Sequence, residues 1–401
     1  MSGDRKSQPY RTQSFKPSPD PLPTYAPAGG PWDALPFFDD GHRQLAGGIE
    51  EFVKREIAPL AAGDEVATED NAREYVLRLA NARWLQYAVR GEIRACSLIR
   101  YHLARASALA DAMFAMQGLG AIPILVGGSE TQRKTWLSRI EEGSIAAFAL
   151  TEDGAGSDPA GMQLKASKVD DFYRLDGEKT FISNAGIADV TVVFARTAPG
   201  DKDAFSAFLV RGGTKRMKAK PIEVISPHPI GRLFFDSVDV KESDRLGSEG
   251  DGLKIAFATL DRFRPTVGAA ACGMARRALE ESVARAKGRQ QFGKPLAAFQ
   301  GIQFMLADMA TELAAAELLV ARAAWEADRG AAGLKLAAAM SKRFATDYAH
   351  AIVDRAVQIH GGLGVTKGSV VERLYRDVRA LRIYEGTSEI QRLVIARELT
   401  R

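Results

Sequence analysis

The sequence predicts a mostly helical α+β protein in which helices, a compact antiparallel β segment and a second set of helices follow one another. Helix-like spacing of apolar residues occurs before about residue 145 and after about residue 248, and short β-rich runs fill the interval. The 401 residues are enough for two or three cores. We expect a Pro-rich N-terminal arm (1–36), an N-terminal helical domain (37–145), a middle β-domain (146–247) and a C-terminal helical-bundle domain (248–401).

Composition narrows the class of protein. Hydrophobic residues make up 46% and charged residues 26%, which is typical of globular chains. The net charge is +4, and no Lys/Arg cluster with interleaved aromatic residues is present, so we expect no nucleic-acid partner. The N-terminus lacks the apolar core of a secretory signal, and no stretch reads as a transmembrane segment. We predict a cytoplasmic protein, or a mitochondrial-matrix protein if the source is eukaryotic.

Cysteine and histidine usage agrees with that location. Cys96 and Cys272 have apolar or small neighbours, which indicates buried free thiols in a reducing compartment. The five histidines are scattered without ligand spacing, so we expect no metal site.

Four helices are expected in the N-terminal part. Residues 35–62 are predicted to be helical, and residues 71–87 and 94–116 follow as two further runs. Ser129 begins a fourth, capped helix. The apolar face of the first run contains Phe38, Leu45, Ile49, Phe52, Val53 and Ile57.

The middle part consists of short runs rich in β-branched and aromatic residues. Asp176-Gly177 between two of them is a strong hairpin signal. The runs are 146–151, 162–169, 172–177, 179–183, 189–196, 204–210 and 232–240.

The C-terminal part is expected to be helical from about residue 250 onward. A polar connection at 288–300 separates two long helices, and the glycines after His360 end another. Ser388 and Gln391 have capping-box spacing, so a last helix is expected to start there. The core stripe of the helix after 300 contains Ile302, Met305, Met309, Leu313 and Val320.

Several segments have residues suited to a ligand, although each alone also fits a plain structural role. The Gly-rich turn 151–159 follows a strand, lets backbone approach a ligand and places Ser157 for a phosphate, but a plain turn is favoured when it stands alone. Residues 179–184 combine an aromatic and a hydroxyl side chain that suit a flat ring and its edge. Arg289 either pairs with a phosphate or is part of a polar connection between two helices.

Glu385 lies in the turn before the last expected helix. A carboxylate there is commonly solvated or interacts with the helix dipole. Enclosed by apolar groups, it would have a raised pKa and act as a general base. The residues alone leave both alternatives open.

In combination, these segments resemble the acyl-CoA dehydrogenase family. The resemblance covers the chain from about Phe38 to the C-terminus, and five independent motifs occur in the family order. They lie within AFALTEDGAGSD, DGEKTFISNAG, GRQQFGKPLAAFQGIQFMLADM, QIHGGLG and IYEGTSEIQRLVIARE, and LDRFRP is a further stretch that resembles the family.

The resemblance implies a fold, a cofactor and an assembly. The family has an N-terminal helical domain, a middle β-barrel-like domain and a C-terminal four-helix bundle, and it binds FAD noncovalently. Neighbouring subunits complete the FAD site, so a homotetramer is expected, with a dimer as the alternative. The residues matched to FAD contacts are Phe148, Leu150, Thr151, Ser157, Phe181, Ser183, Arg289, Gln291, Phe292, Gln300, Gln358, Gly361, Gly362, Thr387 and Glu389.

The resemblance also implies the reaction. Glu385 would remove the α-proton of an acyl-CoA while the β-hydride passes to flavin N5, and an electron-transfer flavoprotein would accept the electrons. The base position of another family branch is Phe263 here, which cannot take a proton. Substrate contacts are expected at Ser157, Asp261, Arg264, Tyr384 and Gly386, although an Asp261–Arg264 helix-packing ion pair is an equal alternative.

The acyl group stays open among straight, cyclic, aryl and carboxylated chains. Ala110 occupies the position where glutaryl-specific relatives have Arg, which disfavours glutaryl-CoA. Arg94, Arg100 and Arg105 lie nearby in the sequence. One of them would suit a carboxylated acyl group, but solvated helix residues are favoured. The loop before residue 232 also departs from the family, with ISPHPIGR in place of a longer segment.

Two competing hypotheses differ in the chemistry they predict. One is a flavoenzyme of the same fold with oxidase, monooxygenase or desulfinase activity, and the retained Glu385 argues against the last of these. The other is a non-catalytic scaffold, against which the intact FAD and base motifs count.

Overall fold

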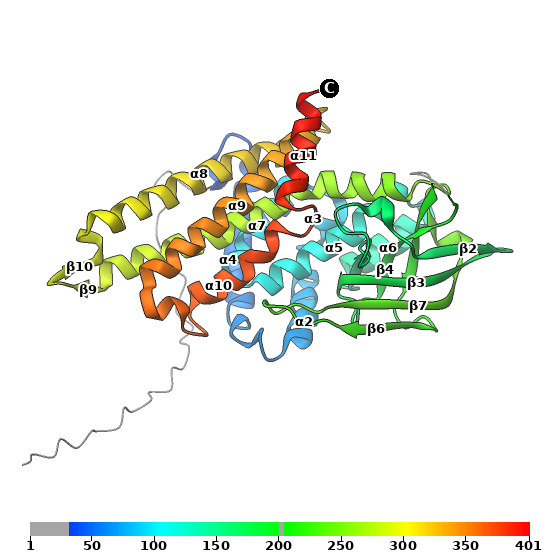
Figure 1. Ribbon diagram of the computed structural model, residues 1–401, viewed down its shortest axis with the longest axis horizontal. Coiled ribbons are helices and arrows are strands. Elements are labelled where there is room, and N and C mark those ends of the chain that lie inside the picture. The colour runs from blue at the N-terminus through cyan, green and yellow to red at the C-terminus, as the bar shows by residue number, and fades with distance from the viewer. Residues whose placement is uncertain (1–31, 200–203) are drawn as a thin grey trace, which may run out of the picture.

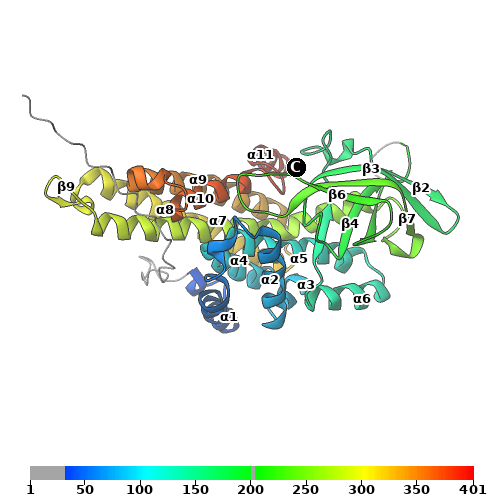
Figure 2. The same cartoon turned by 90° about the horizontal axis from the view of Figure 1, so that it is seen from below.

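The computed structural model of the chain describes residues 32–199 and 204–401, and it has the predicted order of helices, sheet and helices. The sheet lies at one end of the long C-terminal helices (Figure 1). Seen from below, the N-terminal helices lie together along one side of the bundle (Figure 2). The expected arm lies mostly outside the described residues, but Trp32–Ala34 forms a turn of 3₁₀-helix in which Trp32 is buried. The last part of the expected arm therefore contributes Trp32 to the core.

Two of the predicted N-terminal helices are broken. The run 71–87 forms α2 and α3 because Arg83 between them adopts a left-handed φ of 61°. The run 94–116 forms α4 and α5 because Ser107 is extended and caps α5 by accepting a hydrogen bond from Ala110 N at 3.0 Å. Ser129 caps α6 as predicted. The helices are α1 Asp40–Phe52, α2 Thr68–Asn81, α3 Leu85–Arg90, α4 Ile93–Ala106, α5 Ala108–Gly127 and α6 Glu130–Glu141.

Helix α5 corrects the expectation that no stretch is apolar enough to cross a membrane. By length and composition this helix passes that test, but 83% of its apolar window is buried inside the protein. That burial is typical of a core helix. Its Gln117 accepts a hydrogen bond from Ala146 N at 3.0 Å, which ties α5 to the first strand.

The middle part is one curved sheet in the order β6-β7-β3-β2-β4-β5-β8, with β1 paired to β4. The β1–β4 and β2–β4 pairings are parallel, so the sheet is mixed rather than purely antiparallel. Among the described residues no pairing joins β6 to β8, and the sheet is not a closed barrel. The strands are β1 Ala146–Ala149, β2 Lys165–Val169, β3 Phe172–Ser183, β4 Val190–Arg196, β5 Phe205–Arg211, β6 Met217–Pro221, β7 Ile230–Lys241 and β8 Arg245–Leu246.

The hairpin predicted at Asp176-Gly177 is wrong. Strand β3 continues through both residues, and its register against β7 shifts there as a bulge. Gly177 permits the bulge because its φ is 134°. The turn between β2 and β3 occurs instead at Asp170, whose φ is 50°.

Alternating residues of the sheet enter two different cores. On β4, Val192 and Phe194 pack with the N-terminal helices, whereas Val193 and Ala195 face the interior of the curved sheet. Both faces of this strand are therefore buried, which explains its continuous apolar sequence. The sheet thus packs against α5 and the start of α7 (Gly252–Gly288).

The C-terminal part has four helices around a shared core and a fifth that projects from it (Figure 1). A small β9–β10 hairpin forms the predicted 288–300 connection. Cys96 and Cys272 are buried free thiols, as predicted. The elements are α7 Gly252–Gly288, β9 Gln290–Gln291, β10 Lys294–Pro295, α8 Gln300–Asp328, α9 Leu334–His360, α10 Val370–Arg379 and α11 Ser388–Leu399.

Helices α4 and α7 touch through a glycine. A Cβ placed on Gly273 would lie 2.2 Å from the carbonyl oxygen of Tyr101. No larger residue fits without moving one helix backbone, because the obstructing atom is itself backbone.

We expect Gly273→Ala to lower the free energy of unfolding by about 1–3 kcal/mol through this overlap. Gly47→Ala is the matched control, because Gly47 is an exposed glycine inside α1 with no atom within 4 Å of the added Cβ. Better helix propensity should stabilise this control by about 0.5–1 kcal/mol. Urea unfolding followed by circular dichroism measures both, and equal effects would contradict the close contact.

Candidate active site

Glu385 lies in the short loop between the 3₁₀ turn Ala380–Arg382 and α11. Its backbone has a left-handed φ of 55°. Such a conformation costs about 1–3 kcal/mol at a residue other than glycine and is concentrated at functional sites. The next residue, Gly386, also has a positive φ of 89°. The loop therefore holds a strained conformation that the surrounding helices must maintain.

The Glu385 carboxylate is held away from water. Its Oε2 atom is buried and has no hydrogen-bond partner among the described residues. Burial raises the pKa of Glu385, and the positive charges of Arg100, Lys342 and Arg264 oppose that rise. Of the two alternatives left open by the sequence, the geometry favours the desolvated carboxylate.

Three side chains hold the loop through its backbone carbonyls. Arg264 Nε on α7 donates to the Glu385 carbonyl at 3.2 Å. Lys342 Nζ on α9 donates to the Gly386 carbonyl at 2.7 Å, and Gln391 Nε2 on α11 donates to the same oxygen at 2.9 Å. Because these bonds use carbonyl oxygens, the Glu385 carboxylate stays free for chemistry.

Arg264 forms the helix-packing ion pair with Asp261 that was one of the two expectations for these residues. Its Nη1 donates to Asp261 Oδ1 one turn earlier on α7, which is the helix-packing ion pair. Its Nε reaches the Glu385 loop at the same time. Together with Tyr384 and Gly386 in that loop, the expected substrate residues of the C-terminal part lie around one point. Ser157, the remaining expected substrate residue, is exposed in the Gly-rich loop of the sheet.

The expectation of solvated arginines on α4 is wrong. Arg100 is buried, and it donates through Nε and Nη2 to Asp111 at 2.7 and 2.8 Å and through Nη1 to Thr266 at 2.9 Å. The partner carboxylate offsets the cost of burying the guanidinium. The other two are also paired: Arg94 with Asp328 at 2.9 Å and Arg105 with Glu280 at 2.8 Å. Ala110 is fully buried.

A buried ion pair shapes the Gly-rich loop that was matched to FAD. Lys179 Nζ on β3 lies 2.8 Å from Glu152 Oε1 and 3.0 Å from the Leu150 carbonyl. The Glu152 carboxylate also accepts from the backbone of Gln163 and Leu164 at 2.6 and 3.0 Å, which closes the loop. The Thr151 carbonyl accepts from Thr180 N at 2.9 Å. The loop that carries Ser157 is therefore fixed to β3.

The end of β3 has the features of a cofactor-binding surface. Phe181 is 57% exposed and has a left-handed φ of 54°. Two buried polar atoms close to it in sequence, Thr180 Oγ1 and Asn184 Oδ1, have no hydrogen-bond partner within the part of the chain that the structure describes. Exposed aromatic carbon beside unpaired polar atoms suits a flat ring with a polar edge, such as a flavin. Phe148 and Leu150 lie on and just after β1, which pairs with β4 in the same sheet, and the chain therefore fits FAD at this place.

The remaining matched residues lie elsewhere. Arg289, Gln291, Phe292 and Gln300 are exposed around the β9–β10 hairpin, at the end of the bundle far from the sheet (Figure 1). Phe292 is 92% exposed with a φ of 51°. Gln358, Gly361 and Gly362 are exposed where α9 ends. Within one chain these residues do not join Phe181 and Ser183.

The start of α11 differs from the prediction by one residue. Thr387, not Ser388, is the N-cap, because its Oγ1 accepts from Ile390 N at 3.3 Å. Ser388 Oγ instead donates to Asp347 at 2.6 Å, and Gln391 bonds the loop carbonyls. Glu389 is exposed and lies 3.3 Å from Arg392.

Sequence reasoning missed Lys342, Asp111 and Gln391 as parts of the site. Lys342 interrupts an Ala-rich helical run, and Asp111 interrupts an apolar one. A charged residue at a core-facing helix position indicates a buried polar contact, but the sequence does not say which residue makes that contact. Burial lowers the pKa of Lys342 to about 8, so its charge is present at neutral pH.

Comparison with known proteins agrees with this architecture. Three family profiles match in order: the acyl-CoA dehydrogenase N-terminal domain over residues 39–144, the middle domain over 147–238 and the C-terminal domain over 250–400.

Individual relatives cover nearly the whole chain. A probable acyl-CoA dehydrogenase, FadE25, of Mycobacterium leprae is 38% identical over 92% of this chain and 99% of its own length. A 3-(aryl)acrylate reductase of Clostridium sporogenes is 39% identical over 90% and 99%. The structure of butyryl-CoA dehydrogenase from Megasphaera elsdenii superposes with a TM-score of 0.85 at 33% identity, over 91% of this chain and 99% of that one. The chain belongs to the acyl-CoA dehydrogenase family of oxidoreductases.

Proposed function

We propose that the protein oxidises an acyl-CoA thioester to the 2-enoyl-CoA with bound FAD, and that Glu385 is the base. The observation that carries the proposal is the buried Glu385 Oε2 atom, which has no hydrogen-bond partner among the described residues. Burial is the largest influence on the pKa of this carboxyl and raises it. A carboxylate whose pKa is raised toward the working pH is suited to remove a weakly acidic proton.

The residues of the sheet would hold the flavin ring and its phosphates. Phe181 would lie against the ring, Ser183 would bond its edge, and Thr151 and Ser157 would line the ring and pyrophosphate. A solved acyl-CoA dehydrogenase from Bacillus anthracis in complex with FAD is 30% identical, with a TM-score of 0.85 over 91% of this chain and 68% of that one. Bound FAD supplies the acceptor for the hydride that leaves the β-carbon.

The Glu385 loop would do two things to the substrate. Its carboxylate takes the α-proton, and its backbone N–H donates to the thioester oxygen, where negative charge develops. Among the described residues this N–H has no backbone acceptor. Arg264, Lys342 and Gln391 keep the carboxylate and the N–H in place by holding the neighbouring carbonyls. Expulsion of water by the acyl chain would strengthen both interactions.

A second copy of the chain would complete the cofactor site. The exposed group around Phe292 and the end of α9 lies too far along the bundle to serve the sheet of its own chain (Figure 1). We therefore infer a homo-oligomer, with a tetramer preferred to a dimer. We place the protein in the cytoplasm.

An electron-transfer flavoprotein is the proposed electron acceptor. Slow reaction of the reduced protein with oxygen would distinguish this function from that of an oxidase or a monooxygenase.

Glu385→Gln should abolish reduction of the flavin by acyl-CoA while FAD stays bound. Loss of a general base lowers the rate by about 100- to 10,000-fold. Anaerobic mixing with a panel of acyl-CoAs, followed by flavin absorbance, measures the rate. Glu51→Gln, at an exposed position on α1, is the control and should bleach normally.

Stability separates a chemical effect from misfolding. A carboxyl with a raised folded pKa stabilises the fold most below its unfolded pKa of about 4.3 and loses that contribution as pH rises through the folded value. At pH 8, Glu385→Gln should therefore be at least as stable as the parent protein. An unstable variant, or one that bleaches at the parent rate, would contradict the assignment.

The rate of flavin reduction should rise with pH as Glu385 ionises. Lys342→Met removes a positive charge that lowers the Glu385 pKa, so the rising limb should move to higher pH. Stopped-flow rates from pH 5 to 9 test this. Lys254→Met is the control because Lys254 is 83% exposed. If the pH dependence of flavin reduction is the same in Lys342→Met as in the parent protein, the effect of the Lys342 charge on the Glu385 pKa is refuted.

A further inference from the structure

His228 lies against the residue expected to bond the flavin edge. Its Nε2 atom is 2.6 Å from the Ser183 hydroxyl oxygen. Ser183 ends β3, two residues beyond the strained and exposed Phe181. His228 comes from the loop between β6 and β7, where the chain departs from the family pattern. The contact thus links an unusual loop to the proposed flavin surface.

Bonds on both sides of His228 fix its loop. Asn184 N donates to the Pro229 carbonyl at 2.6 Å, and Arg376 Nη1 on α10 donates to the Ile225 carbonyl at 3.1 Å. Ser226 donates to the buried carboxyl of Asp377 on α10. Because these anchors belong to β3 and α10, the imidazole is positioned by the framework of the site.

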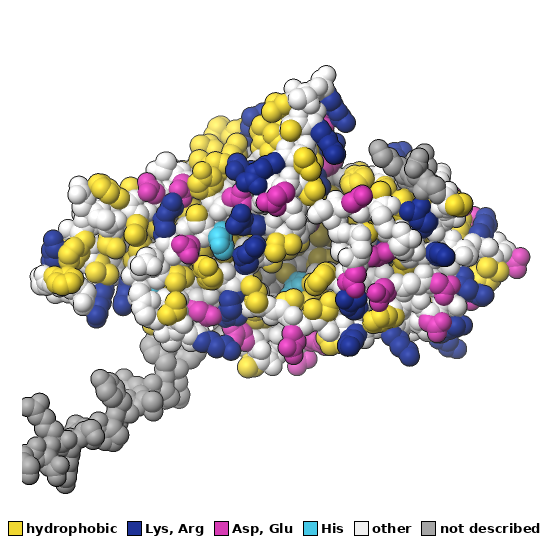
Figure 3. Space-filling view, in the orientation of Figure 1, with side chains coloured by type: hydrophobic (Ala, Val, Ile, Leu, Met, Phe, Trp, Pro, Cys, Tyr) yellow, Lys and Arg dark blue, Asp and Glu magenta, His cyan; other side chains and the backbone are white. Residues whose placement is uncertain are grey.

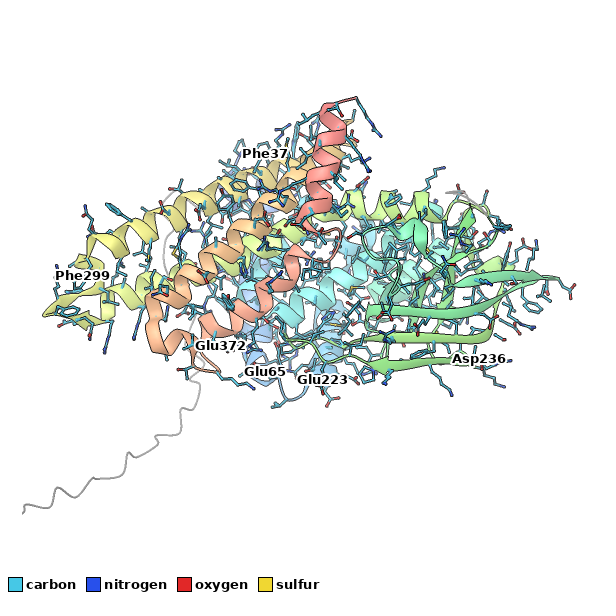
Figure 4. All side chains as sticks on the ribbon, viewed as in Figure 1. Phe37, Glu65, Glu223, Asp236, Phe299 and Glu372 are labelled. Carbon is cyan, nitrogen blue, oxygen red and sulfur yellow. The ribbon has the colours of Figure 1, made fainter. Side chains whose placement is uncertain are left out.

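His228 also faces a cavity of about 680 Å³. The cavity lies between residues 219–231, the turn that follows β3, the start of α2 and α10. Figure 3 shows this face of the molecule hollowed between the bundle and the sheet. The labelled side chains Glu65, Glu223 and Glu372, which line the cavity, lie along the lower edge of this face (Figure 4). The Ser183–His228 pair is therefore next to space that a ligand can enter.

The protonation state of His228 suits a hydrogen-bond relay. Burial lowers its pKa to about 4, so the ring is neutral at working pH. A neutral imidazole has one nitrogen that donates and one that accepts, and its Nε2 takes either role according to the tautomer. The Ser183 hydroxyl has one proton. If Nε2 donates to the Ser183 oxygen, the hydroxyl proton points away from His228 and can be donated to another group. If Nε2 accepts that proton, the Ser183 oxygen can only accept hydrogen bonds from other groups.

We propose that His228 is a positioning residue that sets whether the Ser183 hydroxyl donates or accepts toward bound FAD, and thereby sets the redox potential of the flavin. The inference rests on the proposed function, because it needs FAD beside Ser183. The oxidised and reduced forms of a flavin differ at N5, which accepts a hydrogen bond in the first and donates one in the second. Fixing the Ser183 proton therefore stabilises one form over the other.

The test measures the midpoint potential and spectrum of FAD bound to the full-length protein. His228→Leu should shift the potential and the flavin absorbance band. His228→Gln, whose amide can still bond Ser183, should keep both values close to those of the parent protein. In a Ser183→Ala background, His228→Leu should add nothing. His350→Leu, at a histidine of α9 whose Nδ1 lacks a partner among the described residues, should leave the potential unchanged.

A measurement on the unmodified protein covers the case in which His228→Leu does not fold. With ¹⁵N-labelled histidine, the Nε2 resonance of His228 should move when the flavin is reduced, and an unmoved resonance would overturn the proposal. Equal potentials in the parent and His228→Leu, or shifts that add to that of Ser183→Ala, would also overturn it while leaving the dehydrogenase function intact. Failure of the parent protein to bind FAD would overturn the proposed function, and this inference with it.

Discussion

The arrangement depends on burying the Oε2 atom of the Glu385 carboxylate while no described residue gives it a hydrogen bond. Such burial is costly unless nearby charges offset it. Arg100, Lys342 and Arg264 supply positive charge from three different helices, while their own hydrogen bonds go to Asp111, to the Gly386 carbonyl and to the Glu385 carbonyl. The carboxylate is thus stabilised by charge but left free to take a proton.

This electrostatic arrangement requires close helix packing. Arg100 on α4 reaches Thr266 on α7, and the same two helices meet at Gly273, where a Cβ would collide with the Tyr101 carbonyl. Phe263 on α7 fills the space opposite Gly118, with its ring 2.4 Å from a Cβ built there. Phe263 therefore has a packing role at the position where another branch of the family has its base.

Backbone strain marks the expected functional surfaces. Phe181, Phe292 and Glu385 all have left-handed backbones, yet they lie on the sheet, at the far hairpin and on the loop before α11. Bulky residues rarely adopt this conformation unless the surroundings enforce it. The three would come together only if another chain supplied the hairpin, so the proposed FAD site depends on the proposed assembly.

The sequence by itself determined the order of helices and strands, the cap at Ser129 and the buried thiols, because these depend on local periodicity, capping residues and the apolar character of neighbouring residues. The breaks at Arg83 and Ser107 were not predicted, and the turn predicted at Gly177 was wrong, because one residue's backbone angle decides there between continuing and ending an element. Only the tertiary structure decided the environment of Glu385 and the partners of Arg100, Lys342 and His228. Their desolvation and pairing arise from residues that lie far apart in the chain, such as Arg100 and Thr266, which are 166 residues apart, and no local pattern specifies such contacts.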